Sequence, residues 1–231
     1  MNRNPDGLPA ALALLPGELL IDESWLSERV DHLGRSSGGT ERRTNATLWW
    51  YSASTVLLGP AVHELVTAGT GLNLSPSTLR FTLRDNGYLE RVIAGARLDP
   101  GPSALGRHLD DALSLMIEPL ARIGGASERS LWAIAVDSLA TRVLAETSVT
   151  PGGTDRAPQI ATAVAEAAAR LRPLPRYVDV RGRPGGPDRR YIKRGSCCLL
   201  FRVPGGLCIS CPKQTPADRL ARLQQHARST G

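Results

Sequence analysis

Residues 44–68 read TNATLWWYSASTVLLGPAVHELVTA and include the most apolar part of the chain. A stretch of this length predicts a long helix at the centre of the core, and it contains Trp49, Trp50 and Tyr51. We expect a bend near Pro60, because proline lacks an amide donor and its ring clashes with the preceding turn. Polar residues, glycine and proline interrupt the apolar run before it reaches the roughly 18–20 residues that a membrane span needs. We therefore expect no stable membrane insertion.

Apolar residues recur at helical spacing on both sides of this stretch. Aromatic residues make up only 4% of the chain, so leucine, valine, alanine and isoleucine must build most of the core. That composition is typical of helices packed on helices. A Ser/Gly-rich break at residues 36–39 precedes the long helix. We predict further helices over residues 24–33, 104–123, 128–146, 157–171 and 216–228.

Two shorter segments have strand patterns. In residues 78–93, apolar and polar residues alternate, and Asn86-Gly87 can supply the positive backbone dihedrals of a two-residue turn. Residues 177–192 predict a second, smaller hairpin. The predicted fold class is mainly α (α+β): a helical bundle with one or two small β-hairpins, and a C-terminal cysteine-rich loop followed by a helix.

Charge is distributed unevenly over the 231 residues, of which 42% are hydrophobic and 22% charged. This balance excludes wholesale disorder and fits one folded domain, or one domain with an appendage. Residues 1–169 hold fourteen arginines against nineteen acidic residues, a net charge of −5, whereas residues 170–231 hold fourteen basic against three acidic residues, a net charge of +11. We expect a helical body, residues 1–175, and a basic C-terminal region, residues 176–231, that together form one integrated domain.

The N-terminus makes a poor signal peptide. Asp6 follows Arg3, and the apolar residues 8–15 contain Pro9 and stop at Pro16 with no small-residue cleavage site. We therefore expect a cytoplasmic protein. Because thiols stay reduced in the cytosol, its cysteines are expected to bind a metal or do redox chemistry rather than form disulfides.

All four cysteines, Cys197, Cys198, Cys208 and Cys211, lie in one window of fifteen residues. A Cys-x-x-Cys such as the second pair commonly directs two thiolates at a metal. The first pair is adjacent, and neighbouring residues of an extended chain project to opposite sides, which suits a two-iron cluster better than a single zinc ion. The spacing favours iron-sulfur, with zinc and unliganded thiols as the alternatives.

Positive charge flanks the cysteine window. Lys193, Arg194 and Arg202 lie next to the thiols, and positive charge near the sulfurs favours the reduced, more negative state of a cluster. We expect Gly205-Gly206 to form the tight turn that brings the two cysteine pairs together.

Residues 193–212 read KRGSCCLLFRVPGGLCISCP. This window resembles the C-terminal signature of the FhuF-type ferric-siderophore reductases: a basic pair, a Cys-Cys, an aromatic residue, a Pro-Gly turn and a Cys-x-x-Cys-Pro. Upstream, residues 48–52 resemble the aromatic stretch of that family, and residues 130–132 resemble its Trp-containing helix start. The resemblance implies a [2Fe-2S] cluster on Cys197, Cys198, Cys208 and Cys211.

The resemblance also implies an oxidoreductase that reduces siderophore-bound ferric iron in the cytoplasm. Hydroxamate or catecholate oxygens hold ferric iron tightly and ferrous iron weakly, so one electron releases the metal and no general acid or base is needed. The ferric siderophore is then the small-molecule partner. No Gly-rich dinucleotide fingerprint follows a strand, so we expect a separate electron donor such as a ferredoxin or a flavin reductase.

Other residues are candidates for binding the chelate or the electron donor. Trp49, Trp50 and Tyr51 could line a chelate pocket, although adjacent aromatic residues on an apolar helix more often belong to the core. Arginines of the second predicted hairpin could dock an acidic electron donor or an anionic chelate. They are Arg181, Arg183, Arg189 and Arg190.

Two other functions remain open at this point. One is a zinc-stabilised four-cysteine protein that binds nucleic acid through the basic region, although that region has few aromatic residues for base stacking and no recognised reading motif. The other is a cluster protein that senses iron or redox state without reducing a chelate. We expect the reductase, with no nucleic acid as partner.

Overall fold

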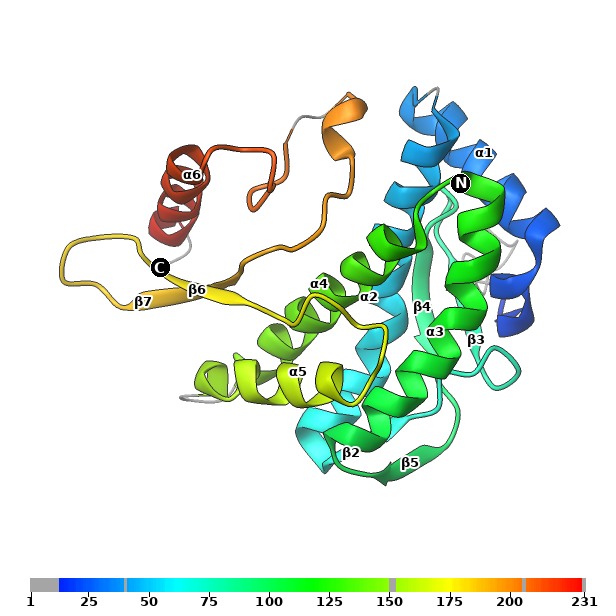
Figure 1. Ribbon diagram of the computed structural model, residues 1–231, viewed down its shortest axis with the longest axis horizontal. Helices are drawn as coiled ribbons and strands as arrows, with labels where there is room; N and C mark the ends of the chain where they lie inside the picture. Colours follow the sequence, from blue (N-terminus) through cyan, green and yellow to red (C-terminus); the bar gives the residue numbers. More distant parts are fainter. Residues whose placement is uncertain (1–12, 40, 150–152, 205–206, 230–231) are drawn as a thin grey trace, which may run out of the picture.

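Helices form most of the protein (Figure 1). The computed structural model describes residues 13–39, 41–149, 153–204 and 207–229. The described residues form six α-helices: α1 (Glu23–Ser37), α2 (Arg42–Ala68), α3 (Pro102–Gly124), α4 (Glu128–Thr147), α5 (Ala157–Glu166) and α6 (Pro216–Ser229). The predicted fold class, mainly α with small hairpins and a cysteine-rich loop before a final helix, is confirmed.

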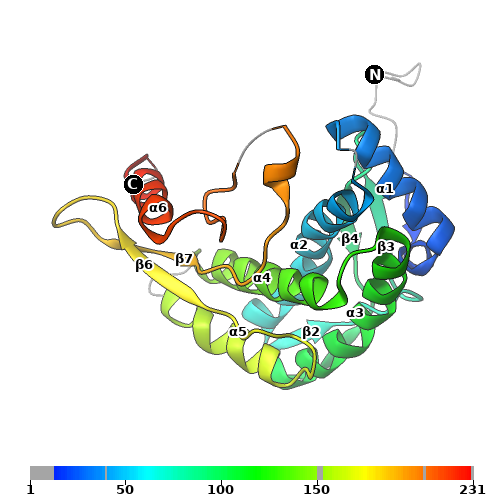
Figure 2. The same cartoon turned by 45° about the horizontal axis from the view of Figure 1, so that its top comes forward.

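Helices α2 and α4 lie side by side at the centre of the molecule (Figures 1 and 2). The indole Nε1 of Trp50 donates a buried hydrogen bond of 2.8 Å to the carbonyl of Leu131 on α4. The hydroxyls of Ser54 and Ser138 lie 2.7 Å apart between the same two helices. These bonds satisfy the polar groups that close helix packing buries.

Helix α3 packs against α5 at a close approach that requires a glycine. A Cβ atom at Gly106 of α3 would lie 2.2 Å from the carbonyl oxygen of Val164 on α5.

Helix α1 is longer than predicted: it continues through Ser37 and ends at Gly38, whose φ is +69°. The break expected at residues 36–39 is therefore limited to Gly38 and Gly39. Gly38 ends the helix because glycine readily adopts the left-handed conformation.

In the part of the chain that the structure describes, three small antiparallel sheets complete the body and the C-terminal region. The first has the order β1-β3-β4, the second pairs β2 with β5, and the third is the β6–β7 hairpin. Sequence periodicity did not predict β1, β2 or β5, since they are only two to four residues long. The strands are β1 (Leu15–Pro16), β2 (Thr70–Leu72), β3 (Arg80–Leu83), β4 (Leu89–Ile93), β5 (Arg97–Pro100), β6 (Tyr177–Arg181) and β7 (Asp188–Ile192).

The β3–β4 hairpin is confirmed, but its turn was predicted one residue out of place. The amide of Gly87 donates to the carbonyl of Arg84 at 2.8 Å, so Asp85 and Asn86 are the central residues of the turn. Gly87 follows them with a φ of +80°, and the strand register shifts after Thr82. A turn of this kind ending in a left-handed glycine is the usual three-residue hairpin loop.

The C-terminal region lies against one side of the helical body (Figures 1 and 2). Strand β7 contacts α4, the short 3-10 helix η3 (Leu200–Arg202) contacts α2, and α6 packs on β6. Helix α6 starts as predicted: the hydroxyl of Thr215 accepts from the amide of Asp218 at 3.1 Å. Helix α5 is shorter than expected and ends at Glu166. None of the helices in the described ranges is long and apolar enough to cross a membrane.

Candidate metal centre

The cysteine window follows β7 and has little regular structure apart from η3. Leu199, directly after the adjacent cysteines, has a left-handed φ of 62°, which is unusual for a residue with a side chain and reverses the chain there. In the second pair, the amide of Cys211 donates to the carbonyl of Cys208 at 3.1 Å, which closes the Cys-x-x-Cys turn. The predicted turn at Gly205-Gly206 lies outside the described residues.

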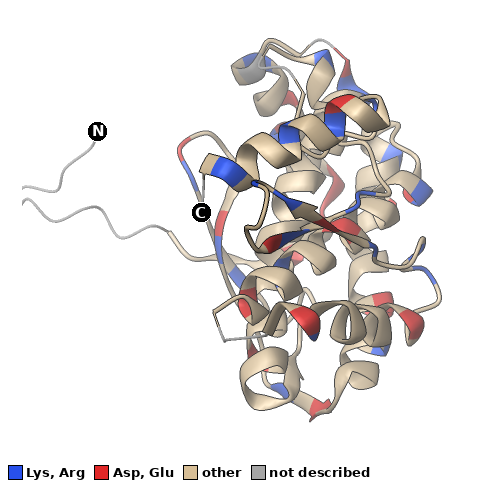
Figure 3. Cartoon of the chain, turned by 90° about the vertical axis from the view of Figure 1, so that its left-hand side faces the viewer, with Lys and Arg blue, Asp and Glu red and all other residues tan. Residues whose placement is uncertain are grey.

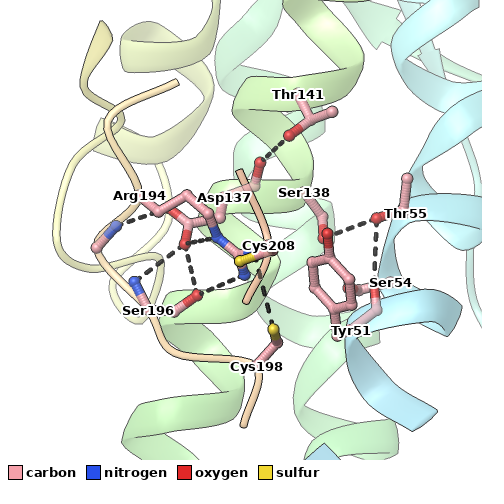
Figure 4. Close-up of polar contacts among 11 residues, drawn as sticks. Tyr51, Ser54, Thr55, Asp137, Ser138, Thr141, Arg194, Ser196, Cys198 and Cys208 are labelled. Carbon is pink, nitrogen blue, oxygen red and sulfur yellow. Dashed lines mark hydrogen bonds and ion pairs between the residues drawn. The ribbon is translucent and has the colours of Figure 1, made fainter. Parts of the chain in front are cut away.

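The two cysteines of the adjacent pair face different surroundings. Cys198 is buried, with 2% of its surface exposed, and its thiol lies near the guanidinium of Arg194 (Figure 4). Cys197 is half-buried and lines a pocket at the surface. Neighbouring side chains of the window therefore point to different sides, as the sequence predicted.

The side chain of Arg194 is buried beside the thiols of Cys198 and Cys208 (Figure 4). Its Nη1 lies 3.6 Å from the Sγ of Cys208 and 3.9 Å from the Sγ of Cys198. The thiol of Cys208, the backbone of Leu200 and the guanidinium of Arg194 lower the pKa of the Cys198 thiol below its usual value, whereas the contact with Cys198 and burial raise the pKa of Cys208. The thiolate is the form in which cysteine binds metal, so the guanidinium favours a ligand-ready thiol.

The carboxylate of Asp137 on α4 anchors the segment that leads into the cysteines. It accepts hydrogen bonds from the backbone amides of Gly195 and Ser196, both at 3.0 Å, and from the hydroxyl of Ser196. Its Oδ2 also lies 3.4 Å from the Nε of Arg194. Asp137 was missed in the sequence, where the available signal was one carboxylate inside the apolar stretch of a predicted helix.

The ring of Tyr51 on α2 packs against the guanidinium of Arg194. The Cζ of Arg194 lies 4.6 Å from the centre of this ring, a cation–π contact. Tyr51 is thus the member of the aromatic triplet that reaches the site. Trp49 and Trp50 are 2% and 1% exposed and belong to the core, where the ring of Trp49 packs edge-on against Trp25.

Gln214 supports the second cysteine pair and was also missed. It is buried, its amide donates to the carbonyl of Cys211 at 3.2 Å, and its side-chain Nε2 donates to the carbonyl of Cys208 at 2.9 Å. Gln214 therefore bonds both ends of the Cys-x-x-Cys turn, Cys211 through its backbone amide and Cys208 through its side chain. A glutamine in a polar loop carries no sequence signal for such a role.

The other basic candidates are divided between this site and the hairpin. Arg202 lies beside the pocket that Cys197 lines and forms an ion pair with Glu41. Arg190 on β7 is bound by Asp179 at 2.7 Å and by Asp155 at 3.2 Å. Arg189 stacks over Tyr191 on the same strand, and Lys193 is exposed.

Acidic residues compensate part of the charge of the hairpin. Arg181 pairs with Asp188 at 2.9 Å across the two strands, in addition to the Asp179–Arg190 pair. Figure 3 shows basic and acidic residues side by side on this face. The large positive balance of residues 170–231 is therefore not spread evenly over a single surface.

A pocket of about 840 Å³ opens beside Cys197, and we call it the Cys197 pocket. Its walls come from the N-terminal ends of α2 and α4, from the segment after α5, and from the cysteine window. Trp132, Phe201 and Leu199 are its largest apolar lining residues. Its volume lies in the range of roughly 300–1,000 Å³ that is typical of small-molecule sites.

The residues present fit an iron-sulfur cluster by their chemistry. All four cysteines are free, two of them are buried, and a buried guanidinium lies against two of the thiols. Four thiolates are the ligand set of a [2Fe-2S] cluster. Within the described ranges, no three or more His, Cys, Asp or Glu side chains lie close enough together to hold a metal ion, so the thiols fit the cluster by their chemistry and not by their present spacing.

Four free thiols in one segment, beside a buried cation, define a candidate iron-sulfur protein. Residues 194–213 match the family model of the FhuF 2Fe-2S C-terminal domain. This segment is thus similar to the FhuF C-terminal domain, which confirms the resemblance seen in the sequence, and the match indicates a [2Fe-2S] cluster as the cofactor. No curated protein matches the chain.

Proposed function

We propose that this protein is a cytoplasmic ferric-siderophore reductase that uses a [2Fe-2S] cluster, with Cys197, Cys198, Cys208 and Cys211 as the cluster ligands. When bound, the cluster supplies a carrier for one electron. One observation carries the proposal: one of the four free thiols lines a pocket of small-molecule size, while the others lie in the protein interior or beside a buried cation. A ferric chelate in this pocket would lie next to a cluster ligand.

The chemistry of the substrate explains why one electron is sufficient. Oxygen ligands hold the hard ferric ion much more tightly than the ferrous ion, so reduction loosens the metal without breaking a covalent bond. The chain's own residues then have three tasks: they hold the chelate beside Cys197, keep positive charge next to the thiolates through Arg194, and position that charge through Asp137.

We further propose that the electron comes from a separate protein, such as a ferredoxin or a flavin reductase. The exposed basic residues of the C-terminal region would attract an acidic donor. The helical body, residues 1–175, and the C-terminal region, residues 176–231, would work as one integrated domain. This division fits the contacts of the site, because Asp137 and Tyr51 of the body hold Arg194 of the C-terminal region.

Anaerobic purification tests the cofactor and its ligands. We expect a reddish-brown protein with about two irons and two labile sulfides per chain. Single Cys→Ser variants at each of the four positions should each lower the iron and sulfide content. A colourless protein with one zinc ion would overturn the proposal and would favour the zinc-stabilised alternative.

A stopped-flow experiment tests the reaction itself. The protein is reduced chemically, mixed with a ferric chelate, and followed by cluster absorbance while a ferrous-specific dye traps the product. We expect the cluster to be reoxidised as ferrous iron appears, one electron per iron. If no ferric hydroxamate, catecholate or carboxylate chelate reoxidises the cluster, the reductase proposal fails and a sensor becomes the better interpretation.

A further inference from the structure

A second cavity reaches the cysteine window from a different side than the Cys197 pocket. It has a volume of about 290 Å³ and lies between α2, α4 and the end of β7, and we call it the Ile209 groove. Among the residues that the structure describes, the two cavities have no lining residue in common. The window therefore faces one cavity through Cys197 and the other through Ile209 and Ser210.

The Ile209 groove borders on the buried guanidinium that contacts two of the thiols. Arg194 lines the groove, and its Nη1 lies 3.6 Å from the Sγ of Cys208 and 3.9 Å from the Sγ of Cys198. Neither of these cysteines lines the Cys197 pocket. A group seated in the groove would thus approach the cysteine set from the side of Cys208, whereas a chelate in the Cys197 pocket would approach it from the side of Cys197.

Apolar and aromatic side chains form much of the wall of the groove. They are Tyr51, Leu144, Tyr191, Ile192 and Ile209. Ile209 is 36% exposed although it lies within the Cys-x-x-Cys turn. Among the described lining residues, the acidic one is Asp137, and its carboxylate already binds Arg194 and Ser196. An apolar centre of this kind is typical of the middle of a protein interface.

Basic residues of α6 and β7 border the groove. The hydroxyl of Tyr191, which lines the groove, lies 3.0 Å from the Nδ1 of His226 on α6. Arg219 and Arg222 precede His226 by two turns and one turn, so helical geometry places them on the same face of α6. These two arginines form no ion pair with any residue that the structure describes. On β7, the guanidinium of Arg189 lies over the ring of Tyr191.

The acidic residue of α6 is bound within the helix start. The carboxylate of Asp218 accepts a hydrogen bond of 2.7 Å from the hydroxyl of Thr215 and forms no ion pair with Arg222. The positive charge beside the groove is therefore available to a partner. An apolar centre with cations at its rim fits an acidic partner, and complementary charge of this kind mainly increases the rate of encounter.

We propose that a small acidic electron-carrier protein of the ferredoxin class docks on the Ile209 groove and its basic rim, on a different side of the cysteine window from the chelate. This inference rests on the proposed function and assigns the place where its electron donor binds. The carrier loses one electron and is oxidised, the cluster gains that electron, and no covalent bond forms or breaks. Electron-transfer encounters use small interfaces, so the groove and one face of α6 are sufficient.

Cross-linking distinguishes the two sides, because the lysines of the chain are Lys193 and Lys213 alone. Lys193 is exposed and directly follows Ile192 of the groove, whereas Lys213 lines the Cys197 pocket. The holoprotein is mixed with an acidic plant-type [2Fe-2S] ferredoxin, and a water-soluble carbodiimide joins carboxylates of the ferredoxin to lysines. We expect peptide mass spectrometry to find the link at Lys193. Absence of this link, with or without a link at Lys213, overturns the proposal.

Charge variants test the basic rim. Reduced ferredoxin is mixed with the oxidised holoprotein at low ionic strength, and stopped-flow absorbance gives the second-order rate constant of electron transfer. In the double variant Arg219→Gln, Arg222→Gln, this constant should fall about fivefold or more and depend less on salt. The control, Arg84→Gln, Arg107→Gln, removes the same charge from exposed arginines of the β3–β4 hairpin and α3, which lie away from α6 (Figures 1 and 2). It should stay within about twofold of the wild type, because distant exposed charges are screened.

A second pair of variants tests the groove itself. Thr141 on α4 lines the groove, and Thr141→Trp should obstruct it and lower the same rate constant several-fold. Thr67→Trp on α2 is the matched control, because both threonines are exposed and each hydroxyl donates at 2.7 Å to the carbonyl four residues earlier. The absorption spectrum of the cluster should be the same in all four variants, which would show that the cysteine set is intact.

The outcomes separate this inference from the proposed function. Equal rate constants in the rim or groove variants and their controls overturn the docking site, even if the reduced protein still reduces ferric chelates. If the ferredoxin links to Lys193 and only the rim and groove variants react slowly, the docking site stands, even if no ferric chelate reoxidises the cluster. That second result would refute the reductase and leave a cluster protein that accepts electrons for another purpose.

Discussion

Asp137 and Arg194 form a buried ion pair in which the Oδ2 of the carboxylate lies 3.4 Å from the Nε of the guanidinium. The pair joins α4 of the helical body to the first residues of the cysteine window, 57 positions away in the chain. The same guanidinium reaches the thiols of Cys198 and Cys208. The carboxylate therefore positions both the backbone that leads into the cysteines and the positive charge beside them.

Replacement of Asp137 should damage the site more than the fold around it. In Asp137→Asn, the buried guanidinium loses its counter-charge and at least one of the hydrogen bonds to Gly195 and Ser196 is lost. Breaking one partner of a buried ion pair costs roughly 3–5 kcal/mol, so we expect a lower melting temperature and a cluster that is lost more easily. Thermal unfolding and iron release to a chelator measure these effects. Asp99→Asn, on the exposed strand β5, should resemble the wild type; equal cluster lability in both variants would contradict the role of Asp137.

Removal of the charge of Arg194 should lower the reduction potential of the cluster. Arg194→Gln takes a positive charge away from two thiols that lie within 4 Å of it, so the reduced, more negative state loses stabilisation. Coulomb energies at this distance predict a decrease of roughly 60–180 mV. A redox titration, monitored by electron paramagnetic resonance, measures the midpoint potential of the cluster. Arg194→Lys should recover most of the potential if charge is decisive, and an unchanged potential in Arg194→Gln would show that the guanidinium acts only in packing.

Loss of one buried thiol should remove the cluster and spare the helices. Cys211 is 3% exposed, but most of the hydrophobic core is built from residues of α1 to α5. In Cys211→Ser we expect iron and sulfide content to fall several-fold while the helical circular dichroism signal stays near that of the wild type. Ser210→Ala is the neighbouring control and should keep the cluster. Global unfolding of Cys211→Ser would instead mean that the cluster is required for the fold as well.

Acid should destabilise the body through His108 on α3. Its Nε2 accepts a hydrogen bond of 2.7 Å from the amide of Leu74, which requires the neutral ring, and burial lowers the pKa of His108 below its ordinary value. A lowered folded-state pKa means that the unfolded chain binds more protons, so this contribution is present above about pH 6.5 and is lost as the pH falls below it towards the folded-state pKa. The free energy of unfolding in urea should fall less between pH 7.5 and pH 5.5 in His108→Gln than in the wild type. His32→Gln, on α1, serves as the control; if the wild type and His108→Gln show the same pH dependence, the prediction is wrong.

Local patterns in the sequence predicted the elements that depend on local physics. Residues 44–68 became most of α2, and the Thr215-Pro216 start of the last helix formed the expected cap, because helix periodicity and capping involve neighbours within one or two turns. The β2–β5 pairing was not predictable in this way. In this sheet Thr70 pairs with Pro100 and Leu72 with Arg97. Strands this short contain too few residues to show an alternating pattern of apolar and polar side chains.

The sequence by itself determined that the protein is mainly helical and that four thiols lie close together in one basic segment, because both facts are properties of neighbouring residues. Only the tertiary structure decided which residues of the body serve that segment. Asp137, Tyr51 and one part of the wall of the Cys197 pocket come from helices far away in the chain. Their roles follow from burial: a carboxylate, a guanidinium and thiols removed from water must find partners in one another, and packing of α2 against α4 sets which partners are within reach.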